Sequence, residues 1–204
     1  IILTTVLLGI GVGALLVALP RLRDVSYQRA VAAAMGLGAC SAVAGLFAVN
    51  QLPNIFASLA QSVSNSTWLL FLCQGMLTAC VLFLPACSLG AALPLGIAGW
   101  RNAARSTGWA VGGMYAVNTF GAIIGSLLAG FVLLPLIGST KLVVAGAALG
   151  IIAAVALLLS DSRAQRSNAW LHAGALAVLF AICVATVPEI DIKHLQRGVF
   201  RGIQ

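Results

Sequence analysis

The stretch that decides the fold is residues 112–138, which read GGMYAVNTFGAIIGSLLAGFVLLPLIG. It is long enough to cross a bilayer, because a spanning helix needs about 20 mostly apolar residues. Yet it carries Tyr115, Asn118 and Thr119 where a simple anchor would carry leucines. Water cannot satisfy polar groups at that depth, so these side chains must find a protein partner, line a wet cavity or serve a function.

The composition of the whole chain is that of a membrane protein. Of its 204 residues 61% are hydrophobic and 7% are charged, whereas about 25% of a soluble domain is charged. We therefore predict an all-α fold, a polytopic transmembrane helical bundle in the lipid bilayer. Charged or proline-containing gaps divide the chain into about six predicted spans, at residues 1–19, 30–49, 68–90, 109–134, 142–160 and 170–187.

The basic residues follow every second predicted span. The net charge is +7, but the cations are dispersed in short loops without interleaved aromatics, so no nucleic acid partner is indicated. The positive-inside rule assigns the face with these loops to the cytoplasm. A sixth crossing would place the tail outside, and the sequence leaves the side of the tail open. The arginines concerned are Arg21, Arg23, Arg29, Arg101, Arg105, Arg163 and Arg166.

The two ends of the chain suggest a longer protein. Residue 1 already lies inside an apolar run, so we expect a further span upstream. We assign residues 1–188 to the transmembrane domain. Charged residues then gather in residues 189–204, including Glu189, Asp191 and Lys193, and we expect this tail to begin a soluble domain.

Small residues and prolines suggest how the helices pack. Two pairs, Gly108 with Gly112 and Gly121 with Gly125, have the small-xxx-small spacing that lets another helix approach closely. Asn118 lies between the pairs, and it either bonds to a neighbouring helix or contacts a substrate or ion.

The apolar run at residues 68–100 contains two prolines. A straight helix of that length would reach about 50 Å. We therefore predict kinks at Pro85 and Pro94, with a hinge or part of a cavity wall as the alternative role.

The cysteines do not indicate a metal site. All five lie in predicted spans, and Cys73, Cys80 and Cys87 repeat every seven residues on one helical face. Ligands two helical turns apart, about 10 Å, cannot meet on one ion. We predict that these small side chains pack between helices.

One family resemblance emerges from these motifs. The element LGAALPLG at residues 89–96 and the later YAVNTFGAIIGS at residues 115–126 resemble the membrane region of bacterial multi-span spermidine synthase-like (polyamine aminopropyltransferase-like) fusion proteins. The matching residues are Tyr115, Asn118, Thr119, Gly121, Ala122, Gly125 and Ser126. The tail segment LQRGVFR at residues 195–201 also resembles the approach to the aminopropyltransferase-like domain of that family.

The resemblance implies a bacterial cytoplasmic (inner) membrane protein that anchors a soluble domain and, as a further hypothesis, feeds substrate to it. Such a domain would use a cosubstrate derived from S-adenosylmethionine, but this chain has neither its glycine-rich loop nor its acidic residues. We expect no catalytic residue and no cofactor here. Two alternatives stay open: a fragment of a small-molecule transporter, and an accessory structural subunit of a larger membrane complex whose partners are other transmembrane helices.

Overall fold

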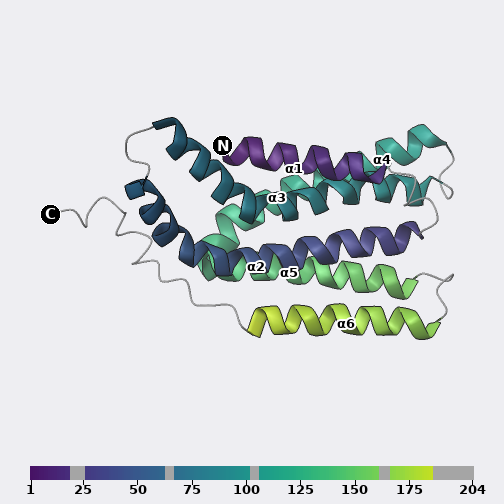
Figure 1. Ribbon diagram of the computed structural model, residues 1–204. Coiled ribbons are helices and arrows are strands. Elements are labelled where there is room, and N and C mark those ends of the chain that lie inside the picture. Colours follow the sequence, from purple (N-terminus) through teal and green to yellow (C-terminus); the bar gives the residue numbers. More distant parts are fainter. Residues whose placement is uncertain (19–25, 63–66, 102–105, 161–165, 186–204) are drawn as a thin grey trace.

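The structure, a computed structural model, describes residues 1–18, 26–62, 67–101, 106–160 and 166–185. This described part is helical and contains no strand, so the all-α prediction is confirmed for it. The expected start of a soluble domain at residues 189–204 lies outside the described residues. The elements are α1 (Ile2–Val17), α2 (Tyr27–Ser62), α3 (Thr67–Trp100), α4 (Thr107–Leu127), the π-helical η2 (Leu128–Leu133), α5 (Leu134–Ser160) and α6 (Arg166–Ala185) (Figure 1).

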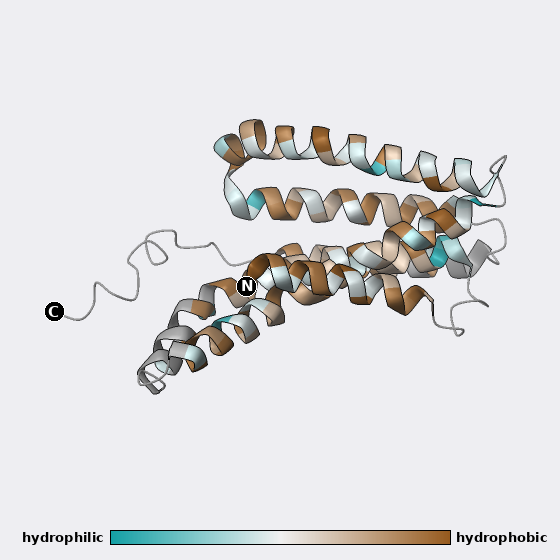
Figure 2. Ribbon diagram, turned by 90° about the horizontal axis from the view of Figure 1, so that it is seen from above, coloured by the Kyte–Doolittle hydropathy of each residue, from teal (hydrophilic) through white to brown (hydrophobic). Residues whose placement is uncertain are grey.

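Three helical stretches of the described chain are long and apolar enough to cross a membrane, namely Tyr27–Val49, Trp68–Trp100 and Thr107–Ser160. Apolar residues recur along the whole length of the helices (Figure 2). Two further apolar helices, Ile2–Val17 and Ala173–Ala185, are shorter. The prediction of about six spans is therefore not confirmed. It differs because the first and last spans are short helices and because the predicted spans 109–134 and 142–160 belong to one helical stretch.

The chain reverses direction within this stretch at Gly138. Its backbone there has φ 77° and ψ 170°, a conformation that essentially only glycine adopts. A straight helix of 54 residues would reach about 80 Å, whereas the apolar core of a bilayer is about 30 Å thick. The reversal sends α5 back along the bundle (Figure 1).

Successive helices alternate in direction, and this alternation gathers the basic end of the molecule. The C-terminal ends of α1, α3 and α5 lie at the same side as the N-terminal ends of α2, α4 and α6 (Figure 1). These ends flank all the arginine-containing loops of the predicted cytoplasmic face. Arg29 and Arg101, which are within the described residues, are exposed at that side.

The closest helix crossing joins α1 to α3. A Cβ atom added to Gly9 would lie 2.7 Å from the Cβ of Ala86. One added to Gly13 would lie 2.8 Å from the carbonyl carbon of Cys87, and one added to Gly90 would lie 2.6 Å from the Cα of Ile10. These helices therefore meet backbone to backbone, which is the contact that small residues permit in membranes.

A second packed region joins α2, α5 and α6. Its centre is Val43, which is fully buried. Cys40 and Cys183 pack against the same cluster, and Cys87 lies at the α1–α3 crossing, whereas Cys80 is exposed. No disulfide links any of the five cysteines, all of which are within the described residues. The buried members of the two clusters in this region are Ala32, Ala39, Val43, Ala147, Ile151, Ala154, Leu158 and Ala173.

Candidate functional site

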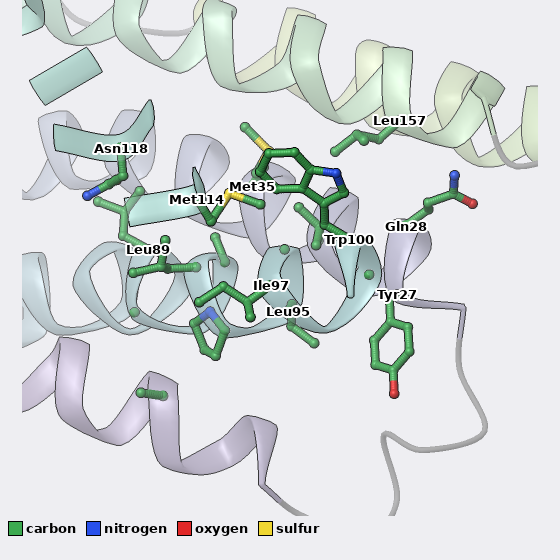
Figure 3. A pocket seen from close by; sticks show the side chains of 18 of the residues that line it. Tyr27, Gln28, Met35, Leu89, Leu95, Ile97, Trp100, Met114, Asn118 and Leu157 are labelled. Atoms are coloured by element: carbon green, nitrogen blue, oxygen red, sulfur yellow. The ribbon is translucent and has the colours of Figure 1, made fainter. Parts of the chain in front are cut away.

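A cavity of about 1440 Å³ lies between α2, α3 and α4 and also touches α1 and α5. Residues 89–97 of α3 form much of one wall, and Met114, Tyr115 and Asn118 of α4 form another. Figure 3 shows Asn118 above Leu89 at one end of this cavity, with Trp100 and Gln28 toward the other. The fold thus brings together the two sequence elements that carry the family resemblance.

Contacts near the basic end hold α4 against α3. A Cβ atom added to Gly96 would lie 3.0 Å from Met114 Cε, and one added to Gly113 would lie 3.1 Å from the Trp100 ring. The Trp100 and Trp109 rings meet edge to face, with centroids 5.6 Å apart and planes at 77°. The side-chain Oγ of Ser106 accepts a hydrogen bond of 3.2 Å from the backbone N–H of Trp109 and caps α4.

Beyond this joint α4 stands away from the rest of the described chain. A Cβ atom added to Gly112, Gly121 or Gly125 would have no neighbouring atom within 4 Å, and one added to Gly108 would meet only Ser106 of its own helix turn. Within the described residues these four glycines, which we predicted to contact a helix, meet none. Their role against a partner outside the chain stays a prediction.

Other glycines pack closely against a neighbouring helix. They include Gly9, Gly13 and Gly90 at the α1–α3 crossing, Gly96 and Gly113 at the α3–α4 joint, and Gly36, Gly38, Gly45 and Gly99 of α2 and α3. Gly9 and Gly13 have the same small-xxx-small spacing as the predicted pairs. A single sequence with so many glycines contains this pattern repeatedly, and the pattern alone does not reveal which copy faces another helix.

The polar residues of α4 divide into two groups. Tyr115 and Asn118 line the cavity, whereas Thr119, also exposed, does not. Other hydroxyls in the apolar helices bond to their own backbone: Thr78 Oγ1 donates to the Gln74 carbonyl at 2.8 Å and Ser126 Oγ to the Ile123 carbonyl at 3.0 Å. No hydrogen bond of Asn118 occurs within the described part of the chain.

The position of Asn118 along α4 bears on the energetic cost of leaving its amide without a hydrogen bond. The residue lies eleven positions after Thr107, where α4 begins, and therefore about 16 Å along the helix. That distance is about half the thickness of the apolar core of a bilayer. Where α4 crosses a bilayer from its first turn, an amide at this position without a hydrogen bond would cost free energy, and a ligand or water in the cavity would serve as its partner.

The charged side chain in the described lining of the cavity is that of Arg29, at the basic end. Among the described lining residues there is no Asp or Glu. Pro94 has no N–H, so the Gly90 carbonyl in the wall loses the helical hydrogen bond that residue 94 would donate. The polar side chains of the lining are Ser26, Tyr27, Gln28, Arg29, Tyr115 and Asn118.

Both predicted kink residues, Pro85 and Pro94, lie inside the continuous helix α3. The course of α3 bends between its Thr67 end and the part beside α1 (Figure 1). Pro94 lines the cavity and Pro85 does not. The kink stays a prediction for both prolines, and the cavity-wall alternative matches the position of Pro94.

Within the described residues, no group of three or more His, Cys, Asp or Glu side chains is placed to hold a metal ion. What the site offers is a mixed apolar and hydrogen-bonding cavity with a basic end. No family model matches the chain, and no curated protein or solved structure matches it either. The resemblance to the membrane region of spermidine synthase-like fusion proteins therefore stays a prediction.

Proposed function

We propose that this chain is the membrane domain of a bacterial spermidine synthase-like fusion protein, which anchors a soluble domain in the inner membrane and presents substrate to it. The observation that carries the proposal is the cavity itself. It is built from residues 89–96 and from Tyr115 and Asn118, the elements on which the resemblance rests. A protein that needed only an anchor would have no reason to place an amide in such a cavity.

The proposal includes six crossings. The turn at Gly138 divides Thr107–Ser160 into two antiparallel passes. The shorter helices α1 and α6 lie along the same bundle (Figure 1). Each of them then crosses with the help of flanking residues, since the bilayer thins around short apolar segments at modest cost. All the arginine-containing loops then face the cytoplasm.

The chemistry of the lining restricts the class of substrate that the cavity can bind. A free polyamine is a multiple cation, and carboxylates are the groups expected to bind it inside a membrane. Among the described residues that line the cavity there is no carboxylate, and Arg29 lies at the basic end. The cavity therefore favours an apolar or amphiphilic compound over the charged amine, and the aminopropyl transfer belongs to the soluble domain.

A second candidate function, an accessory subunit of a larger membrane complex, is favoured by the exposed surface of α4 and η2. Phe120 is 67% exposed and Phe131 is 80% exposed. Lipid would be sufficient to cover these apolar side chains. A partner helix would cover them too, and it would also pack closely against Gly121 and Gly125, whose faces are open.

The experiment compares two substitutions in the full-length protein in native membranes. Asn118→Leu removes the amide that lines the cavity, and Thr119→Leu removes the adjacent hydroxyl that does not. We expect aminopropyl transfer from decarboxylated S-adenosylmethionine to an amine acceptor to fall about fivefold to tenfold for Asn118→Leu, corresponding to about 1–1.4 kcal/mol. Thr119→Leu should leave the rate unchanged.

Two outcomes would count against the proposal. Full activity of Asn118→Leu combined with lower thermal stability would leave Asn118 only a packing role. Absence of any aminopropyl transfer by the full-length protein would remove the spermidine synthase assignment and leave the accessory-subunit candidate, which a larger complex in mild detergent would support.

A further inference from the structure

The geometry points to the cavity between α2, α3 and α4 as a binding site for an anionic phospholipid, with the phosphate near Arg29 and an acyl chain along the apolar wall. This inference rests on the membrane location in the proposed function, and it does not require aminopropyl transfer.

The position of the cavity matches the shape of a lipid. Its lining begins at Tyr27, Gln28 and Arg29, at the start of α2, and continues along α3 and α4 to Asn118. The first three residues lie at the basic end of the bundle, where Trp100 and Trp109 pair. Paired tryptophans are typical of the headgroup level of a membrane. The cavity thus extends from the headgroup level into the depth of the acyl chains.

The two ends of the cavity differ in chemistry as the two parts of a phospholipid do. At the basic end Arg29 lines the cavity, and exposed Arg101 follows the lining residue Trp100 in sequence. Deeper in the membrane the walls carry Leu89, Leu93, Met114 and Val117. Basic pockets between transmembrane helices on the cytoplasmic side bind anionic lipid headgroups. In the described part of the lining no acidic side chain is present that would repel a phosphate.

A lipid also has access from the bilayer. Val117 lines the cavity and is 65% exposed, so the wall formed by α4 is open beside it. Past the joint at Gly96 and Gly113, a Cβ atom at Gly121 or Gly125 has no neighbour within 4 Å. An acyl chain can therefore enter sideways, past α4, without any helix moving.

The test measures lipid binding to the delipidated full chain in detergent by native mass spectrometry. The probes are phosphatidylglycerol and phosphatidylcholine with identical acyl chains. We expect phosphatidylglycerol to bind at least fivefold more tightly. Arg29→Gln should weaken phosphatidylglycerol about fivefold, which corresponds to about 1 kcal/mol for one basic residue, and should leave phosphatidylcholine unchanged. Lys141→Gln is the control, because Lys141 is exposed and does not line the cavity.

A second pair of variants tests the cavity itself. Val117→Trp fills it from an exposed position that does not disturb the core, and we expect binding of both lipids to fall at least fivefold. Val132→Trp makes the same exchange at an exposed site on η2 outside the cavity and should change nothing.

Three results would overturn the inference. The first is equal affinity for the two lipids, and the second is equal behaviour of the two tryptophan variants. The third is that glycerol 3-phosphate displaces the bound lipid at the same concentration at which phosphatidylglycerol does. That result would make the site one for a free anion. All three are measured without any cosubstrate, so failure of aminopropyl transfer is distinguishable from failure of lipid binding.

Discussion

Replacing Gly13 by alanine should weaken the α1–α3 crossing, and the structure allows the size of the effect to be worked out. The new Cβ atom would overlap the Cys87 carbonyl oxygen and would lie 2.8 Å from its carbonyl carbon and 3.0 Å from the Ala91 nitrogen. Carbon atoms attract best at about 3.5–4.0 Å. These are backbone atoms that no rotamer change can move, so α1 must shift away from α3 by roughly 1 Å.

The energetic consequence follows from the loss of contacts along the crossing. A gap of about 1 Å forfeits up to about half of the dispersion attraction between the facing atoms, and overpacking of this kind typically costs about 1–3 kcal/mol. For a chain of this size each kcal/mol lowers the melting temperature by roughly 2–4 °C. We therefore expect Gly13→Ala to lower the melting temperature by roughly 2–12 °C.

The assay is thermal unfolding of the purified chain in detergent, followed by circular dichroism. Gly11→Ala is the matched control, because it adds the same methyl group two positions away where no atom lies within 4 Å. Alanine forms helix better than glycine, so this variant should be as stable as the parent chain or slightly more stable. Equal melting temperatures for the two variants would refute the backbone-to-backbone contact of α1 with α3.

Two further predictions concern the turn and the topology. Gly138→Ala forces a side chain into the positive φ of the turn and should lower the free energy of unfolding by about 1–3 kcal/mol. Gly146→Ala is the control, because its added Cβ atom also meets nothing within 4 Å, and it should cost no stability. Equal shifts in melting temperature for the two variants would contradict the positive φ at Gly138. The topology is tested with two single-cysteine variants, Thr107→Cys and Ser139→Cys, in a background without the native cysteines. We expect an impermeant thiol reagent to label Thr107→Cys from the cytoplasm and Ser139→Cys from the opposite side of the membrane. Labelling of both variants from one side would exclude separate crossings by α4 and α5.

Much of the architecture was accessible from the residues alone because it depends on local physics. In lipid the backbone must satisfy its own hydrogen bonds, so apolar stretches of sufficient length become helices. Arginines in alternate loops marked one face, and the helix ends that flank those loops do lie at one side of the bundle (Figure 1). The prominence of Tyr115 and Asn118 was equally visible, because polar side chains are rare at that depth.

The partners of each residue depended on the tertiary structure. Glycine spacing is the same at Gly9 and Gly13 as at Gly121 and Gly125, yet only the first pair meets another helix within the described chain. The predicted break between residues 134 and 142 became a single turn at Gly138, because the helical stretch continues through η2 and Pro135 and reverses only where glycine permits a positive φ.

The sequence by itself thus determined that the chain is helical and apolar, which end is basic and which polar residues are out of place in lipid. Only the tertiary structure decided that residues 89–96 and Asn118 share one cavity with Arg29. The physical reason is that helix formation depends on the residues within one segment. A cavity depends instead on how far two helices separate beyond the point where they touch. That separation is governed by bulky side chains such as Trp100 and Met114, which lie against Gly113 and Gly96.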